Sequence, residues 1–447
     1  MMLSTRALIV IVLLSISSHV TAQNPFVMDQ FTADPSVRVF DGKVYVYPSH
    51  DIPCTEGKGR PGWFCMEDYH VFSSEDLIDW VDHGIILQQN NVPWARPNNY
   101  AMWAPDCIER NGKYYFYFPT VPRDTTHIKG FTIGVATSNN AAGPYTPEAN
   151  PIANVRGIDP NVFIDKDGQA YLYWSAGNIF GAKLKENMLE LDGDPKILGE
   201  LPTKGLKEGP YMIERNGVYY LTYPHVENKT ERLEYATGDN PLGPFKVAGV
   251  IMDEWPSGCW TNHHSFLQLK DQWYLFYHHN DLSPSFDKNR SIRADSLFFE
   301  ADGTIRKVTP TLRGVGNLPA SRKLQIDRYS AISNDGASAS FLDSTKVSEG
   351  WKLAFDKSGS WARFNSVAFA GKEFKTVKAQ IRSANGGTVE IHLDRTSKSP
   401  VAKLKVPKST EWKTISAPLR GSPRGVHAII SLLSTNATVE IDWLSFE

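Results

Sequence analysis

Five stretches of the chain repeat one pattern, in which a polar turn pair precedes a run of aromatic and β-branched residues. Such runs are typical of strands that follow tight hairpin turns. The turn pairs are Asp41-Gly42, Asn111-Gly112, Asp167-Gly168, Asn216-Gly217 and Asp271-Gln272. Successive turns are separated by about 49 to 70 residues, enough for four strands and their loops. The pattern therefore predicts an all-β fold that begins with a five-bladed β-propeller at residues 23–318.

Beyond residue 324 the hydrophobic pattern changes to short alternating runs such as SWARFNSVAF, TVEIHLDR and TVEIDWLSF, separated by turn residues. This alternation predicts a β-sandwich, jelly-roll-like, at residues 319–447. Helix signatures are nearly absent, and Lys183–Leu191 is the best candidate. To close the propeller circle, we expect residues 24–31 to share a sheet with the strand near 304–308.

The first 22 residues have the pattern of a signal peptide. Arg6 supplies the positive flank, Ala7–Ile16 the apolar core and Val20-Thr21-Ala22 a small-residue cleavage site. We therefore expect an exported protein, periplasmic or extracellular. No later stretch of about 18 apolar residues could span a membrane.

Composition narrows the expected partners. The formal net charge is −2 and there is no long basic run, which gives no electrostatic reason to expect nucleic acid. Aromatic residues make up 12% of the chain, which suits strands and also sugar-stacking surfaces. We expect a monomer that binds carbohydrate.

The four cysteines allow three disulfide connectivities in an oxidising compartment. Cys54 and Cys65 bracket a Gly-rich loop and are the preferred pair. Cys107 and Cys259 either pair near the propeller axis or stay buried and free.

One chemically distinctive residue precedes each turn by nearly the same distance. Counting back nine positions from the second turn residue gives Trp103, Asp159, Glu208 and His263, and counting back eight gives Asp34 in the first unit. If the units are equivalent blades, these five residues converge at the axis. Three carboxylates beside an aromatic ring and an imidazole have the composition of a sugar-cleaving site.

Hydrolysis of a glycoside with inversion needs a carboxylic acid and a carboxylate base about 6.5–9.5 Å apart. Asp34 and Glu208, from non-adjacent blades, suit that separation, and Asp159 adds a charge that raises the pKa of the acid. The contexts Ala33-Asp34-Pro35, Ile158-Asp159-Pro160 and Glu208-Gly209-Pro210 are alike. Asp before Pro is also a common turn-starting pair, so a single such pair could start a turn without any catalytic role.

The five units resemble glycoside hydrolase family 43. The segments that carry the resemblance are FTADPSVRVFDGKVYVYPS, MWAPDCIERNGKYYFYF, GIDPNVFIDKDGQAYLYW, KEGPYMIERNGVYYLTY and NHHSFLQLKDQWYLFYHH. The resemblance implies that Asp34 is the general base, Asp159 the pKa modulator and Glu208 the general acid. The segments TADPS and GIDP differ from the sequence signatures of related families that form a covalent intermediate. This difference argues against a retaining mechanism.

The resemblance also implies a substrate-binding set. His263 matches an axial histidine that binds calcium through water or lies beneath the sugar, with His264 as competitor. Arg290 matches an arginine that hydrogen-bonds sugar hydroxyls, with Arg293 as the alternative. No cofactor is needed for the chemistry, and a structural calcium is the one metal implied.

Aromatic residues complete the predicted pocket. Trp103 is expected to form a wall for the sugar ring, with a place in the core as the alternative. Trp63 and Phe64, on the polar loop between Cys54 and Cys65, are expected at the pocket rim.

The C-terminal segment, from IDRYSAIS to VEIDWLSFE, resembles carbohydrate-binding module family 6. Tyr329, Trp361 and Asn436 are the candidates for an accessory sugar site, and Trp351 and Trp412 compete with them. Alternatively, this domain only packs against the propeller.

These observations favour an inverting glycosidase that removes terminal pentosyl residues from plant cell-wall polysaccharides or oligosaccharides, as a β-D-xylosidase or α-L-arabinofuranosidase. The same acids could serve arabinan, β-galactan or galactofuranosides, because the surrounding loops select the ring. A non-catalytic sugar-binding propeller and a scaffold for protein partners are the other classes, and neither needs three carboxylates in equivalent positions.

Overall fold

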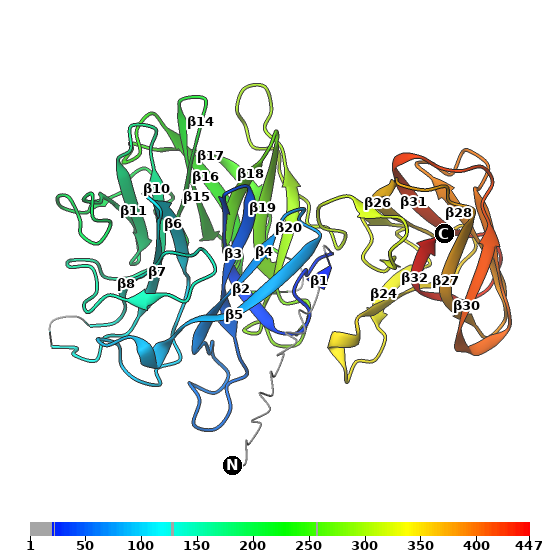
Figure 1. Cartoon of the computed structure of the whole chain (residues 1–447), viewed down its shortest axis with the longest axis horizontal. Helices are drawn as coiled ribbons and strands as arrows, with labels where there is room; N and C mark the ends of the chain where they lie inside the picture. The colour runs from blue at the N-terminus through cyan, green and yellow to red at the C-terminus, as the bar shows by residue number, and fades with distance from the viewer. Residues whose placement is uncertain (1–19, 22, 127–128, 256–257) are drawn as a thin grey trace, which may run out of the picture.

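The computed structural model of the protein describes residues 20–21, 23–126, 129–255 and 258–447 (Figure 1). Within these residues the chain is almost entirely β-structure, with two short 3₁₀ turns, η1 (Gln89–Asn91) and η2 (Val347–Glu349). The predicted all-β class is confirmed: a five-bladed propeller precedes a β-sandwich. No helix in the described part of the chain is long and apolar enough to cross a bilayer.

The five blades are antiparallel sheets that follow one another along the chain. Blade 1 comprises β1 (Val20–Thr21), β2 (Phe31–Phe40), β3 (Lys43–Asp51), β4 (Asp68–Ser74) and β5 (Asp79–Gln88). Blade 2 comprises β6 (Asp106–Arg110), β7 (Lys113–Thr120), β8 (Thr132–Ser138) and β9 (Thr146–Pro147). Blade 3 comprises β10 (Ile158–Ile164), β11 (Ala170–Ser175), β12 (Ile179–Lys183) and β13 (Lys196–Ile197). Blade 4 comprises β14 (Tyr211–Arg215), β15 (Val218–Val226), β16 (Glu231–Gly238) and β17 (Lys246–Met252), and blade 5 comprises β18 (His264–Leu269), β19 (Gln272–His279) and β20 (Ser291–Leu297).

The repeated turn pairs connect β2 with β3, β6 with β7, β10 with β11, β14 with β15 and β18 with β19, although Gln272 of the last pair already belongs to β19. In Asp41-Gly42, Asn111-Gly112 and Asn216-Gly217 both residues have positive φ. This is the conformation of the type I′ turn, whose twist matches that of the flanking strands.

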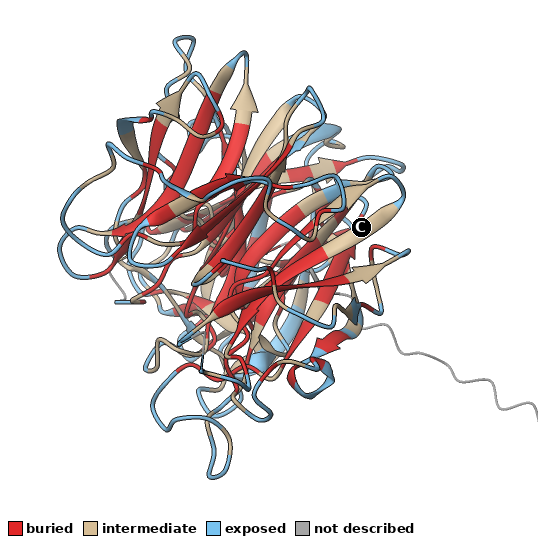
Figure 2. Cartoon of the chain, turned by 90° about the vertical axis from the view of Figure 1, so that its left-hand side faces the viewer, coloured by how far each residue is buried: buried red, intermediate tan, exposed pale blue. Residues whose placement is uncertain are grey.

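The aromatic runs after these turns form the packing layers between blades. Alternate residues of one strand face opposite neighbours, so Val46 packs in a cluster with Phe276 of blade 5, whereas Tyr47 packs with Phe116 of blade 2. Both faces of the central strands are therefore buried (Figure 2).

Two details of the predicted fold are wrong. Residues 24–31 do not pair with 304–308: the Asn24 backbone N–H donates to the Leu312 carbonyl, and its side chain bonds with the backbone of Ala294. Residues 183–191 are not helical, because Leu184 forms a β-bridge with Leu191 around a tight turn.

The sandwich consists of two six-stranded sheets. One contains β21 (Leu318–Pro319), β23 (Ala331–Ile332), β26 (Trp361–Phe369), β28 (Gly387–Leu393), β29 (Ala402–Val406) and β31 (Gly425–Leu433). The other contains β22 (Leu324–Gln325), β24 (Ala337–Phe341), β25 (Trp351–Phe355), β27 (Thr376–Ser383), β30 (Ser409–Pro418) and β32 (Val439–Phe446).

The sandwich packs directly on the propeller (Figure 1). Ile78 of blade 1 belongs to the sandwich core cluster, and Arg322 forms an ion pair with Asp79. The buried Arg313 guanidinium donates to the backbone carbonyls of Asn365 and Ser366 in β26. These contacts fix the two sheet systems against each other.

The cysteines, all of which are described, are free thiols. The expected Cys54–Cys65 disulfide is absent, although both sulfur atoms lie beside Gly59. Each thiol instead contacts a backbone carbonyl, of Trp63 for Cys54 at 3.3 Å and of Lys58 for Cys65 at 3.9 Å. Cys107 and Cys259 are buried and unbridged, one of the two expected outcomes.

Candidate active site

A cavity of about 170 Å³ lies where the first strands of the blades begin. Eight residues singled out from the sequence line it: Asp34, Trp63, Phe64, Trp103, Asp159, Glu208, His263 and Arg290. Four residues that were not singled out also line it: Ile158, Glu231, Trp260 and Thr261. The expected convergence of distant segments is therefore present in the structure.

The Asp-Pro pairs position two of the carboxylates through irregularities in the strands. The pairing of β2 with β3 shifts register between Ala33 and Ser36, and that of β10 with β11 between Ile158 and Asn161. In these bulges Asp34 and Asp159 adopt positive φ, 48° and 57°. A bulge redirects a side chain out of the alternation of the strand, here toward the axis.

In blade 4 the corresponding pre-proline residue is Gly209, with φ of 52°, and Glu208 precedes it. A Cβ at Gly209 would lie 2.9 Å from Nδ1 of His263. Only glycine therefore allows the imidazole to approach this turn so closely. The packing places His263 beside the segment that carries Glu208.

Arg290 is buried between two aspartates. Its Nη1 donates to Oδ1 of Asp34 at 2.8 Å, and its Nε donates to Oδ2 of Asp51 at 2.9 Å. Burial disfavours the Asp34 anion and is the largest single influence on its pKa. Attraction to Arg290 and smaller contributions from His278, His263 and Ser49 together outweigh burial and lower the pKa of Asp34. For Asp51, burial reinforced by Asp34 prevails and the pKa is raised. Asp34 is therefore the carboxyl held as a carboxylate.

His278 also contacts Asp34, through the backbone. Its Nδ1 accepts the backbone N–H of Asp34 at 3.0 Å, and Nε2 lies 3.0 Å from the carbonyl oxygen of Thr261. Burial, reinforced by Arg290, lowers the pKa of His278 well below its ordinary value. A neutral imidazole with Nε2 protonated satisfies both bonds.

Glu208 has the opposite electrostatic environment. Burial, reinforced by the neighbouring Glu231 carboxyl and by Asp34, raises the pKa of Glu208 well above its ordinary value. Glu231, the first residue of β16, is 2% exposed, and burial raises its pKa to about 7. The sequence register did not indicate Glu231, because it lies on the third strand of its blade.

The Asp159 carboxylate links two backbone segments beside the site. Its Oδ2 accepts the N–H of Gly209 at 3.0 Å and its Oδ1 accepts the N–H of Ala104 at 3.3 Å. Burial, partly offset by His263 and reinforced by the other two carboxylates, raises the pKa of Asp159 to about 7. Asp159 thus holds the turn adjacent to Glu208.

Aromatic rings form one side of the cavity around Phe64. Its ring centroid lies 6.2 Å from Trp103 and 6.4 Å from Trp260, and the Arg290 guanidinium lies 4.8 Å from it. Trp63 is 38% exposed, at the rim. Trp260 was missed, although it stands three residues before His263, because only one position per unit was considered.

His264 and Arg293, the alternatives to His263 and Arg290, make contacts outside the cavity lining. His264 is buried and its Nε2 lies 2.7 Å from Oγ1 of Thr222, and Arg293 forms an ion pair with Asp281. Among the described residues, His263 belongs to no group of three side-chain donors close enough to share an ion. A calcium ion held mostly through water, with one imidazole as a minor ligand, needs no such group and stays a prediction.

The accessory sugar site expected in the sandwich stays a prediction. Trp361 and Asn436 lie toward one end, because Trp361 pairs with Leu432 and Asn436 follows in the exposed turn after β31. Tyr329 packs against the sandwich core, and Arg293 of blade 5 is close enough to affect its pKa. Tyr329 is only partly buried, and its part in an accessory sugar site stays a prediction. The two alternative tryptophans contact other side chains of the sandwich. Trp351 stacks on Phe341, and the Arg382 guanidinium lies over the ring of Trp412.

The fold and the paired carboxyls define a propeller-type sugar-cleaving enzyme, and comparisons with known proteins agree. The model of glycosyl hydrolases family 43 matches residues 22–305, and that of carbohydrate binding module family 6 matches residues 331–447. The chain therefore belongs to glycosyl hydrolase family 43, with a family 6 module at its C-terminal side.

Individual relatives support this assignment. A xylosidase/arabinosidase of Bacteroides ovatus is 37% identical over 64% of this chain and 97% of its own length. A β-xylosidase/α-arabinofuranosidase of the same family from a compost microbial metagenome, solved with xylotriose in a calcium-free form, has a TM-score of 0.57 and 35% identity, covering 65% of this chain and 98% of that chain. An arabinoxylan arabinofuranohydrolase of Bacillus subtilis, solved with cellotetraose, shares the fold at 24% identity, with a TM-score of 0.55 over 96% of this chain and 99% of that chain.

Proposed function

We propose that this glycosidase removes terminal β-D-xylosyl or α-L-arabinofuranosyl residues from plant cell-wall polysaccharides or oligosaccharides, with inversion. The observation that carries the proposal is the opposite electrostatic bias of Asp34 and Glu208 in one cavity. The pKa of Asp34 is lowered, and that of Glu208 is raised well above its ordinary value. A base must be ionised and an acid must be protonated for this reaction.

In the proposed reaction Asp34 accepts a proton from water as the water oxygen attacks the anomeric carbon. Arg290 holds the carboxylate in place through its 2.8 Å hydrogen bond. Glu208 donates its proton to the glycosidic oxygen as the bond to the anomeric carbon breaks. After the reaction Asp34 is protonated and Glu208 is ionised. Proton exchange with solvent then restores the starting state of both carboxyls.

Asp159 acts in this proposal as a positioning residue. Its hydrogen bond to Gly209 fixes the turn from which Glu208 extends, and its negative charge disfavours ionisation nearby. Phe64, Trp103 and Trp260 provide the apolar face on which a sugar ring stacks. A cavity of about 170 Å³ suits a single terminal sugar better than an extended chain.

We further propose export of the protein and an accessory role for the sandwich, with the propeller at residues 23–318 and the sandwich at 319–447. Of the predicted leader only Val20–Thr21 lies within the described residues, as β1 paired with Trp80 and Asp79. We assign no step of the reaction to calcium.

The test compares the wild type with Asp34→Asn and Glu208→Gln on 4-nitrophenyl β-D-xyloside and α-L-arabinofuranoside. Each substitution removes a proton transfer, worth roughly 10²–10⁴ in rate. Asp271→Asn, at an exposed turn, is the matched control. Sugar binding without turnover by the wild type would contradict the proposal, and hydrolysis restricted to galactofuranosides, arabinan or β-galactan would overturn its substrate class.

Leaving groups distinguish the two carboxyls. Glu208→Gln should lose most of its activity on xylobiose and retain much of it on dinitrophenyl xyloside, whose leaving group needs no proton. Asp34→Asn should lose activity on both. Equal losses for Glu208→Gln on the two substrates would contradict its role as the acid.

A further inference from the structure

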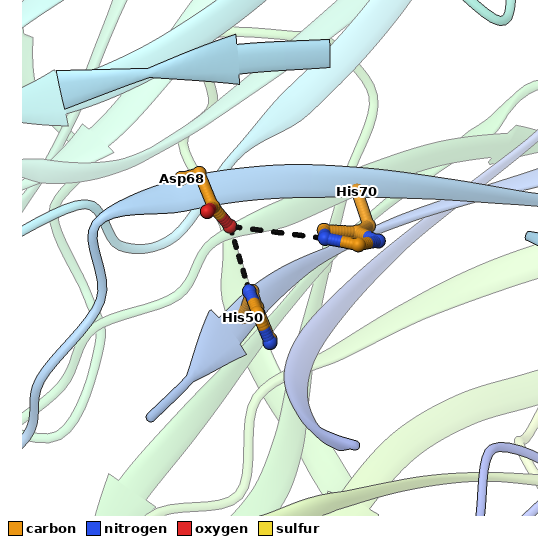
Figure 3. A group of neighbouring side chains, drawn as sticks. All are labelled: His50, Asp68 and His70. Carbon is orange, nitrogen blue, oxygen red and sulfur yellow. Dashed lines mark hydrogen bonds and ion pairs between the residues drawn. The ribbon is translucent and has the colours of Figure 1, made fainter. Parts of the chain in front are cut away.

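Two histidines and one aspartate form a cluster on blade 1, apart from the residues that line the pocket (Figure 3). His50 lies near the end of β3, and Asp68 and His70 occupy the first and third positions of the neighbouring β4. Asp68 and His70 therefore project from the same face of their strand. One ligand atom from each of the three residues lies within 4.8 Å of the other two.

The tautomer of His70 is set by a carboxylate behind it. Its Nδ1 lies 3.1 Å from each oxygen of Asp82, so Nδ1 carries the proton. Asp82 is itself held by Nε2 of Gln30 at 2.9 Å and by the N–H of Gly84 at 2.7 Å. A carboxylate that orients an imidazole in this way is the usual outer support of a metal-binding histidine.

The free nitrogen of His70 consequently faces another acceptor. Its Nε2 atom lies 4.0 Å from Oδ1 of Asp68, which also accepts from Nδ1 of His50 at 2.6 Å. The contact between these two acceptors becomes attractive when a cation lies between them. The three side chains are only 18%, 6% and 13% exposed for His50, Asp68 and His70, so bulk water screens this contact little.

We propose that His50, Asp68 and His70 bind a divalent transition-metal ion of the zinc class, with water completing a tetrahedral sphere. Two imidazoles and one carboxylate suit zinc, whereas calcium prefers oxygen ligands alone. On binding through Nδ1, His50 gives up its Nδ1 proton to solvent and carries one proton on Nε2, which it takes up from solvent if the ring was neutral before. The 2.6 Å contact to Asp68 then widens to roughly the 3.3 Å expected between ligand atoms about 2.0 Å from a tetrahedral ion.

A metal ion at this position would restrain the loop beside it. His50 and Asp68 flank the loop of residues 52–67, which delivers Trp63 and Phe64 to the pocket. An ion bound to both strands would clamp the two ends of that loop. This consequence for the pocket rests on the proposed function, whereas the metal site itself does not.

The test is titration of the untagged, chelator-treated full chain with Zn²⁺ by calorimetry. The cysteines are first alkylated, because Cys54 and Cys65 lie on the same loop and thiolates bind zinc. We expect one equivalent to bind the wild type and at least 10²-fold weaker binding by His70→Ala. Asp82→Asn should weaken binding about 10–100-fold through loss of the outer support. His427→Ala is the matched control, since His427 also pairs with an aspartate, Asp394, at 2.9 Å.

Substitution with Co²⁺ provides a readout that needs no variant. Bound in this site, Co²⁺ should show the intense visible absorption of a tetrahedral complex, whereas the weak spectrum of the hydrated ion would overturn the proposal. Equal Zn²⁺ affinity in the wild type and His70→Ala, with matching circular dichroism spectra, would also overturn it. Activity assays are not part of this test, so failure here leaves the proposed hydrolysis intact.

Discussion

The backbone N–H of Gly209 donates a hydrogen bond to the Asp159 carboxylate at 3.0 Å, which joins blade 3 to the turn that carries Glu208. Asp159→Ala removes this bond together with the one from Ala104. We expect kcat to fall roughly 10²-fold, the scale of a misplaced catalytic group. Asp159→Asn keeps one acceptor oxygen and should lose less. Steady-state kinetics of both variants test this ordering, and unchanged kcat in Asp159→Ala would contradict it.

The close approach of His263 to Gly209 makes a second prediction. In Gly209→Ala the new Cβ would lie 2.9 Å from Nδ1 of His263, so the turn and Glu208 must shift. We expect kcat to fall about 10²-fold. Gly217→Ala is the control, because φ is 83° there and nothing lies within 4 Å of the Cβ position. Both variants should lose about 1–2 kcal/mol of stability from the left-handed backbone conformation, but only Gly209→Ala should lose activity.

Much of this arrangement could be predicted from the sequence, and the residues show why. Turn pairs such as Asn216-Gly217 mark each blade, and the register from them reaches Asp159 and Glu208, because repeated units place equivalent positions around one axis. The convergence of these residues in one cavity agrees with that prediction. Their catalytic roles stay predictions.

Other features depend on contacts between segments that no repeat relates. Glu231 enters the site from a third strand, and His278 from the end of a second strand. Residues 183–191 have a helix-like composition, yet pairing of Leu184 with Leu191 overrides it. Tyr329 packs against the sandwich core, a contact that sequence periodicity does not report.

The charge of Arg290 should control the acidic limb of the pH–rate profile. Attraction to Arg290 is the largest of the influences that together lower the pKa of Asp34 against the effect of burial, and the base works only above that pKa. Replacing Arg290 by Met therefore raises the pKa of Asp34, and the acidic limb of kcat/KM moves to higher pH. Arg293→Met, which removes a buried arginine paired with Asp281, is the control. An unmoved limb in Arg290→Met would refute this assignment.

Glu231 should control the alkaline limb. Burial and the Glu231 carboxyl raise the pKa of Glu208, and the acid works only below that pKa. Glu231→Gln removes the neighbouring negative charge, so the pKa of Glu208 falls and the alkaline limb moves to lower pH. Glu234→Gln, on the same strand but paired with His225, should leave the limb in place. A shift to higher pH in Glu231→Gln would be inconsistent with this electrostatic role.

The stereochemistry of the first product tests the central claim most directly, because it reports whether Asp34 activates water or attacks the sugar itself. Hydrolysis of 4-nitrophenyl β-D-xyloside by the wild type is followed by proton NMR from the first minute, before the anomers equilibrate. The account predicts that α-D-xylose appears first and the β-anomer only later, by mutarotation. Initial release of β-D-xylose would contradict it.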